Sequence, residues 1–329
     1  MTPVIATTDE VTAAAAADQL EKGGNAVDAA VSALLAWPLS LASAGVLVAV
    51  GSGLGHGACL FPARVPGFGL SRPRRLRLLS GSAPAARIAA TCAAPALAAI
   101  LARWGTITMA EAANAAAAAG EAPHQAALTL LAEDGVNAFT RGSHGEDVAR
   151  TLGPLAGGLL TRRDLIEARP DVGEAVGPFE GLWLSQPIVD LRHSAASATA
   201  KSAGRALSVV VIDKQGRIAS ASAEAGVLAE RESSTLPPVD GVVPNTLLAG
   251  QPPARAKKVG QPLPLTCGAA ASGELEQVAL AGFAPELVRA LEARDVADTE
   301  REAGGVLLTV RRSPGGQVEV EGAETVLTP

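Results

Sequence analysis

Residues 201–220 read KSAGRALSVVVIDKQGRIAS, and this stretch decides the fold. The β-branched run Val209–Ile212 suits a pleated, buried strand. Asp213–Gly216 supplies residues that favour a tight turn, and Ile218 begins a returning strand. The stretch therefore predicts a β-hairpin whose first strand starts with the small residues that precede the valines.

Around this hairpin, the composition predicts one large globular unit. The chain has 329 residues, of which 48% are hydrophobic and only 2% aromatic, so Ala, Leu and Val must build its core. A formal net charge of −6 argues against nucleic-acid binding, which needs clustered positive charge to neutralise phosphates. The 3 cysteines and 4 histidines are scattered, so we expect no disulfide framework, no metal site and no cofactor.

Two segments bear on localisation. The N-terminal sequence MTPVIATTDEV has no basic segment followed by an apolar one, and we therefore expect a cytoplasmic protein. Residues 29–63 contain no Lys, Arg, Asp or Glu, which is long enough for a membrane span. A proline and several glycines interrupt this segment, so we interpret it as a buried helix, a loop and a strand rather than a membrane helix.

Local signals predict several helices. Asn25 and Asp28 are placed to cap a helix that Pro38 ends, and Thr161 with Asp164 resembles a capping box. The predicted helices cover residues 9–21, 26–37, 93–103, 109–119, the segment after Thr161, and 285–294. A strand and a glycine-rich turn are predicted within 46–60, and a last hairpin around 314–316. The arginine-rich segment 64–77 is interpreted as a solvated face, and the small polar residues 194–204 as a linker.

Five further motifs occur in order along the chain. They are GGNAVDAAVSALLA (23–36), SGLGHGA (52–58), LARWGTITMAEAANAAAAAGE (101–121), GGLLTRRDLIEARP (157–170) and PNTLLAGQPPARAKKVGQPLPLTC (244–267). With the hairpin, they resemble the motifs of gamma-glutamyltranspeptidases, the family that hydrolyses glutathione or transfers its glutamyl group. The resemblance runs through nearly the whole chain.

The resemblance implies an N-terminal-nucleophile hydrolase, an α+β fold with two stacked sheets between helix layers (αββα). It implies a single domain over residues 1–329, in which 1–203 resembles the large subunit of the family and 204–329 a shortened small subunit. In that family the chain cuts itself before a Thr. The new N-terminal Thr then attacks the gamma-glutamyl amide, with its own amine as the base.

The resemblance also shows which site residues are missing. Counting back seven residues from Asp213 places Ala206 at the nucleophile position, and alanine has no nucleophilic atom. Ser80 stands where the family has the Arg whose guanidinium fork holds the substrate carboxylate. We therefore expect neither self-cleavage nor gamma-glutamyl transfer.

Two further parts of the implied site are altered. The acidic motif that grips the substrate amine has no counterpart in residues 224–238, whose acids are Glu224, Glu230 and Glu232. Thr266 and Cys267 replace the serine pair of the oxyanion site, and the later glycine-rich turn is absent. Four altered parts of one site point to a scaffold that is no longer used for this chemistry.

Weak candidates for a remaining site can still be named. Ser208 lies two residues after Ala206, so both belong to the same face of the strand, and it is either a displaced nucleophile or an ordinary strand serine. Cys267 is a reactive thiol or a buried small hydrophobe, and Thr266 is its neighbour. For substrate binding, the candidates are Ser80 and the turn residues Gly55, His56 and Gly57, whose alternative role is backbone geometry.

Three functions follow from this interpretation. The first is a catalytically inactive gamma-glutamyltranspeptidase-like protein that serves as a structural or regulatory subunit. The second is an amide hydrolase or acyltransferase with a displaced nucleophile, and the third is a small-ligand-binding module. We expect a homo- or hetero-oligomer, and an active relative is one candidate partner. The contact surfaces would be the arginine run 72–77 and the Pro-rich segment 233–254.

Overall fold

A computed structural model describes most of the chain. The described residues are 1–70, 75–76, 84–119, 122–174, 176–179, 182–184, 204–226, 236, 238–244, 257–260, 267–272, 277–282, 308–313 and 316–329. The statements about structure that follow concern these residues.

A seven-stranded antiparallel sheet forms the centre of the molecule. Its strands follow the order β15 (Thr325–Leu327), β1 (Val4–Thr7), β8 (Gly204–Ile212), β9 (Ile218–Gly226), β2 (Ala44–Gly51), β3 (Gly55–Phe61) and β5 (Asp171–Glu174). The predicted hairpin is therefore β8 and β9, in the middle of this sheet. Residues 1–203 and residues 204–329 both contribute strands to it.

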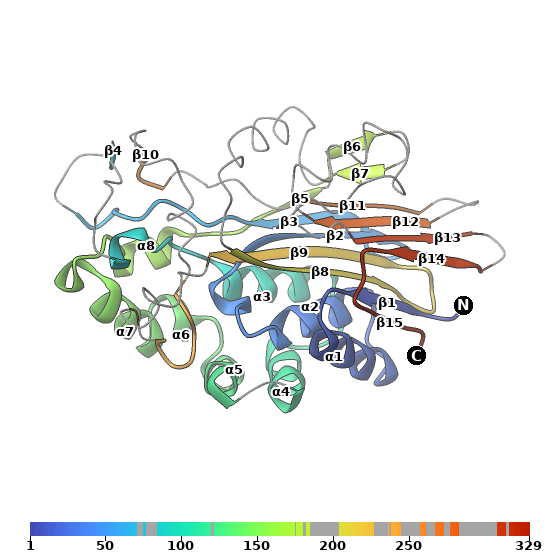
Figure 1. Ribbon diagram of the computed structural model, residues 1–329, viewed down its shortest axis with the longest axis horizontal. Coiled ribbons are helices and arrows are strands. Elements are labelled where there is room, and N and C mark those ends of the chain that lie inside the picture. Colours follow the sequence, from blue (N-terminus) through green and yellow to red (C-terminus); the bar gives the residue numbers. More distant parts are fainter. Residues whose placement is uncertain are drawn as a thin grey trace.

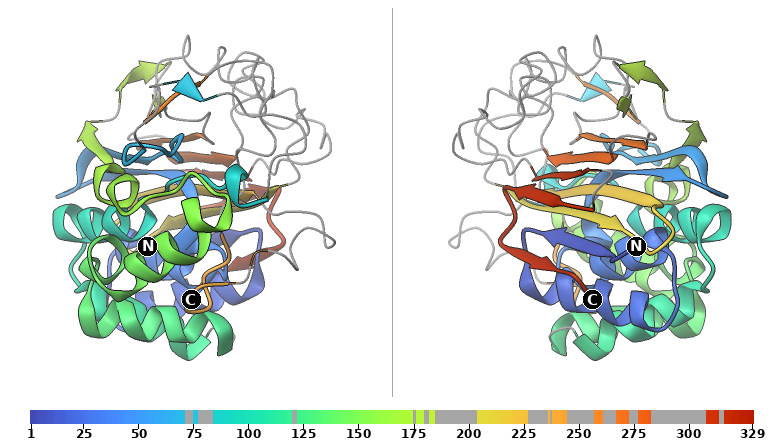
Figure 2. Two further views of the ribbon diagram at one scale, coloured as in Figure 1. Left: turned by 90° about the vertical axis from the view of Figure 1, so that its left-hand side faces the viewer. Right: turned by 90° about the vertical axis from the view of Figure 1, so that its right-hand side faces the viewer.

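A second antiparallel sheet of six strands lies on the first (Figures 1 and 2). Its order is β14 (Val318–Glu321), β13 (Leu308–Arg312), β12 (Gln277–Gly282), β11 (Cys267–Ser272), β7 (Leu182–Leu184) and β6 (Val176–Phe179). A separate short ribbon pairs β4 (Arg75–Leu76) with β10 (Lys257–Lys258).

The described helices cover the opposite face of the first sheet (Figure 1). They are α1 (Glu10–Glu21), α2 (Ala26–Ala36), α3 (Ala93–Trp104), α4 (Met109–Ala119), α5 (Ala122–Asp134), α6 (Asn137–Thr140), α7 (Ser143–Leu152) and α8 (Arg162–Glu167), with 3₁₀ turns at Ser40–Ala42, Pro84–Arg87 and Pro154–Ala156. The described residues thus form a helix layer and two sheets. The helix predicted over 285–294 lies outside them.

Strand alternation divides the interior into two cores. On β8, the odd-numbered residues Leu207, Val209 and Val211 pack with the helices, while Val210 and Ile212 pack with residues of the second sheet. Even-numbered positions of β2, β8 and β9 therefore face the space between the sheets.

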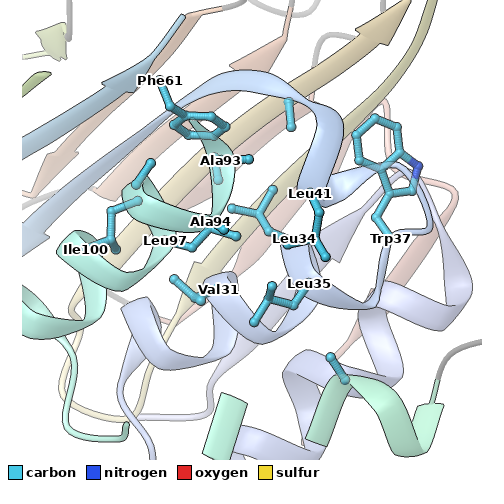
Figure 3. Packing of buried hydrophobic residues seen from close by; sticks show 14 of the residues in the cluster. Val31, Leu34, Leu35, Trp37, Leu41, Phe61, Ala93, Ala94, Leu97 and Ile100 are labelled. Atoms are coloured by element: carbon cyan, nitrogen blue, oxygen red, sulfur yellow. The ribbon is translucent and has the colours of Figure 1, made fainter. Parts of the chain in front are cut away.

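Small residues allow the helix layer to pack closely. Every residue of α2 is buried, and Leu34 lies beside Leu97 of α3 (Figure 3). Gly57 in β3 approaches Trp104 so closely that a Cβ atom there would lie 2.2 Å from the indole ring. This core has few aromatic rings, as the composition indicates, and depends on close backbone approach instead.

Both predicted helix caps are confirmed, and each is a capping box. The Asn25 side chain accepts hydrogen bonds from backbone amides in the first turn of α2. In return, the Asn25 amide donates a hydrogen bond to the Asp28 carboxylate. Asp28 also accepts hydrogen bonds from the backbone and hydroxyl of Thr106, so it joins α2 to the turn between α3 and α4. Thr161 and Asp164 form the equivalent box at α8. These four residues stabilise the scaffold.

One expectation about the arginine-rich segment is wrong. Arg64 is only partly exposed, and its guanidinium donates to the carbonyl oxygen of Gly260 at 3.2 Å. It therefore holds two distant segments together instead of forming part of a solvated face. The run 72–77 lies outside the described residues except for the backbone of β4.

Candidate functional site

The turn of the β8–β9 hairpin is fixed by one buried carboxylate. Asp213 Oδ1 accepts hydrogen bonds from the amides of Gln215 and Arg217, and Oδ2 accepts one from Arg217 Nε at 2.6 Å. The same Oδ2 accepts a bond from the amide of Ala26, at the start of α2. The turn is thus anchored to the helix layer, which fixes the pairing register of the two strands that lead away from it.

Ala206 lies at the far end of this hairpin. Pairing outward from Ile212 and Ile218 places Ala206 directly opposite Glu224, on the face between the sheets. The alanine is half-buried. The position implied for the nucleophile therefore lies in the layer between the sheets, but its side chain offers no atom that could attack an acyl group.

Ser208 shares this face but is shielded. It is 1% exposed, and it pairs with Ser222 across the hairpin. Its backbone amide donates to the hydroxyl of Thr8 at 3.1 Å, which ties β8 to the end of β1. A substrate would reach this hydroxyl only after the layers above it had moved.

Glu224 is the acidic group of this part of the layer. Its two cross-strand partners are Ala206 on β8 and Ala44 on β2. The residue is 8% exposed, and among the described residues no hydrogen bond or ion pair reaches its carboxyl group. Burial raises the pKa of Glu224 to about 7, because a low-dielectric environment disfavours the charged form.

The glycine-rich turn lies at the other end of the sheet. In the β2 ladder, Ala44 stands opposite Glu224, whereas Val50 stands opposite His56. Six residues of strand separate these positions, which corresponds to about 20 Å. The structure therefore does not bring Gly55, His56 and Gly57 together with Ala206. The predicted structural role of Gly57 is supported by its contact with Trp104.

The other sequence candidates are placed only in part. Ser80 and Thr266 lie outside the described residues, as do Glu230 and Glu232. Cys267 begins β11, where it pairs with Gly282. No group of three or more His, Cys, Asp or Glu residues suited to a metal ion occurs in the described part of the chain.

A separate apolar cavity of about 60 Å³ lies among the helices. It is bordered by α3, α7 and α8 and by Val242. The buried His144 also borders it, with Nδ1 2.8 Å from Oδ2 of Asp240. The first sheet separates this cavity from Ala206. Part of the Pro-rich segment thus packs into the core: Leu236, Val239 and Val242 are all buried.

Comparisons with solved structures reveal the same arrangement elsewhere. Cephalosporin acylase from Bacillus halodurans superposes with a TM-score of 0.71 and 14% identity over 99% of this chain and 95% of that one. LmbA2991HD gives a TM-score of 0.67 and 12% identity over 100% and 98%. Both alignments span nearly the whole of both chains. The chain has an N-terminal-nucleophile hydrolase fold.

This result confirms the fold expected from the resemblance to gamma-glutamyltranspeptidases. A gamma-glutamyltranspeptidase from Pseudomonas nitroreducens in complex with L-DON also matches, with a TM-score of 0.48 and 16% identity over 59% of this chain and 74% of that one. No protein-family model and no curated protein matches the chain. At these sequence identities, the similarity to the solved structures shows the fold alone. The reaction must be argued from the residues of the site.

Glu224 is the site residue whose position the motif comparison did not show. It matches no position of the acidic motif, so the sequence named it only as one of three acids in that segment. The hairpin itself contained the signal, because a turn at Asp213–Gly216 with regular pairing sets residue 206 opposite residue 224.

The described helices include none that is long and apolar enough to cross a bilayer.

Proposed function

We propose that the protein is a catalytically inactive representative of this fold that serves as a structural or regulatory subunit. The observation that carries the proposal is Ala206 at the cross-strand position opposite Glu224. Self-cleavage and acyl transfer in N-terminal-nucleophile enzymes both need a side-chain oxygen or sulfur at that position. A methyl group there supports neither step.

Gamma-glutamyl compounds such as glutathione are therefore not turned over. The nearest hydroxyl on the same strand face belongs to Ser208, which is shielded and held by the β1 contact described above. Purified protein incubated with a chromogenic gamma-glutamyl amide is expected to release no product above the buffer rate. Steady release that disappears in Ser208→Ala would contradict the proposal.

The subunit role is the finer part of the proposal. A protein that keeps two packed cores but lacks the catalytic group would act through its surface. We propose that it forms an oligomer with itself or with an active relative. Size exclusion with light scattering tests this directly. We expect a mass at least twice the 32.9 kDa of one chain, alone or with a co-purified relative, and a clean monomer without partner would refute it.

An amide hydrolase or acyltransferase with a displaced nucleophile is the second candidate. The observation that favours it is that Ser208 shares a face with Glu224 and lies two residues along the neighbouring strand from the position opposite it. A carboxyl group with a pKa of about 7 suits a general base at neutral pH. Ser208→Ala and Glu224→Gln should each abolish hydrolysis if this candidate is right, whereas inactivity of the wild-type protein excludes it.

A further inference from the structure

The apolar cavity in the helix layer has a buried polar side chain in its wall. Among the described residues, the polar ones that border it are Thr91, Thr140 and His144. Of these three, only His144 is buried, with 4% of its surface exposed. The Thr140 hydroxyl donates to the carbonyl oxygen of Asn137 in its own helix. Because a few polar groups orient a ligand in an otherwise apolar site, His144 forms the polar end of this cavity.

The ring of His144 has two fixed contacts. Its Nδ1 atom lies 2.8 Å from Oδ2 of Asp240, and its centroid lies 4.6 Å from that of the Phe139 ring, which also borders the cavity. A carboxylate only accepts hydrogen bonds, so the hydrogen atom in the contact with Asp240 belongs to Nδ1. In a neutral imidazole, Nε2 then carries a lone pair and is a hydrogen-bond acceptor.

An uncommon turn places Asp240 against this ring. Val239 and Val242 are buried and exchange two backbone hydrogen bonds. Between them, Asp240 has a φ of +48° and Gly241 a φ of +80°, and Asp240 is the one residue other than glycine with a positive φ in the described part of the chain. Asp adopts this conformation more readily than most residues, but it remains uncommon. Backbone strain of this kind is concentrated at ligand sites.

The volume of the cavity sets the size of its occupant. One water molecule needs about 10–15 Å³ of such space, so a cavity of about 60 Å³ holds roughly four to six non-hydrogen atoms. Water suits this cavity poorly, because a buried water molecule needs several polar partners and the described wall consists mainly of Ile, Leu, Val and Ala side chains. A small aliphatic molecule with a single polar group fits both the volume and the wall.

The acceptor on His144 decides which polar group this is. A hydroxyl group donates a hydrogen bond to Nε2 without bringing a charge into the apolar wall. A carboxylate ligand would place a second negative charge near Asp240, which is unfavourable. An ammonium ligand would lose its hydration in a wall that supplies few acceptors. A neutral ligand with a hydroxyl group avoids both penalties.

We propose that this cavity is a binding site for a short aliphatic alcohol. The hydroxyl group of the ligand donates to Nε2 of His144, and its carbon chain fills the apolar part of the cavity. The site lies in the helix layer, and it needs no group from Ala206 or Glu224. The proposed function and this site can therefore fail independently, because fragments in an intact-mass measurement would refute the former and leave the latter unchanged.

Butan-2-ol and butan-2-one test the site as a matched pair. They share one carbon skeleton and have nearly the same volume, but only the alcohol donates a hydrogen bond. Protein with labelled Leu and Val methyl groups is titrated at about pH 8.5, where an ordinary histidine is neutral. The NMR signals of Leu152, Leu160 and Val148 at the cavity should shift, and those of Leu308 and Val310 in the core between the sheets should not. The alcohol should bind about three- to tenfold more tightly than the ketone, the ratio expected for one hydrogen bond.

Three variants assign this preference to the cavity. His144→Phe keeps an aromatic ring beside Phe139 but removes Nε2, so the two ligands should bind with affinities within about twofold of each other. Glu146→Gln changes an exposed acid on the same helix and should keep the wild-type ratio. Val148→Phe adds volume to the cavity wall and should abolish binding of both ligands, so it tests the site even if His144→Phe fails to fold.

Four results would overturn the site. They are the absence of shifts at the cavity methyl groups with butan-2-ol, equal affinities of the wild-type protein for the alcohol and the ketone, undiminished binding to Val148→Phe, and an unchanged alcohol-to-ketone ratio in folded His144→Phe. If the contact between His144 and Asp240 served only to hold the chain together, that variant would lose stability but keep the ratio.

Discussion

Replacing Glu224 by Gln should stabilise the protein at high pH relative to low pH. The difference in the free energy of unfolding between variant and wild type should be constant at low pH and grow as pH rises. Burial raises the pKa of this carboxyl from 4.5 to about 7 in the folded state. Between these pH values the folded chain binds more protons than the unfolded chain, so the free energy of unfolding falls as pH rises. Gln is nearly isosteric with the protonated acid and does not titrate.

The magnitude follows from the size of the shift. One pKa unit corresponds to about 1.4 kcal/mol, so the full displacement costs the wild-type protein about 3 kcal/mol above pH 7. The stability difference between Glu224→Gln and wild type should therefore grow by about 3 kcal/mol from pH 4.5 to pH 7.5. It should then level off.

Guanidinium unfolding at half-unit pH steps measures this difference. Trp37 and Trp104 are buried, so intrinsic fluorescence reports the transition. The contributions of other titrating groups cancel in this difference, because both proteins contain the same groups. Glu174→Gln serves as the control and should show a difference that does not depend on pH. A difference below about 1 kcal/mol for Glu224→Gln across the whole range would refute the reasoning that burial raises the pKa of this carboxyl in the folded protein.

Three further predictions concern the scaffold. Burial lowers the pKa of His124, so the wild-type protein should lose stability as pH falls below about 6.5. When unfolding of His124→Gln is measured over the same pH range, this loss of stability should be absent. Burial raises the pKa of Cys59 and that of Cys92 to about 12. In a Cys267→Ser background, Ellman's reagent should therefore find no reactive thiol in native protein at pH 8 and two after unfolding, whereas rapid native labelling would contradict this. Gly57→Ala should lower the free energy of unfolding by about 1–3 kcal/mol, because its methyl group would overlap a buried indole ring; an unchanged denaturation midpoint would contradict that packing.

Features that depend on neighbouring residues could be predicted from the sequence. Asn25 with Asp28, and Thr161 with Asp164, fix helix starts through contacts three residues apart. The hairpin turn is equally local. The helices α5 and α6 were not predicted, because α5 has little segregation of apolar and polar residues, and α6 is only one turn long. The helix α7 was not predicted either, although its apolar and polar residues are well segregated.

Features that depend on long-range pairing could be predicted only in part. The spacing to Asp213 identified Ala206, and the resemblance identified the fold. The sequence could not show that Gly55 and His56 lie at the opposite end of the sheet, because that separation depends on how β2 pairs with both β3 and β9. The importance of Glu224 likewise depends on two alanines from different strands and on a second sheet that covers it.

The central claim is that the chain is not processed at residue 206. Intact-mass spectrometry of purified protein, before and after several days at 37 °C, tests this claim most directly. We predict one species at the full-length mass near 32.9 kDa, without fragments at either time. Two chains whose junction lies at Ala206, at Ser208 or in the preceding linker would contradict the account and favour an active enzyme.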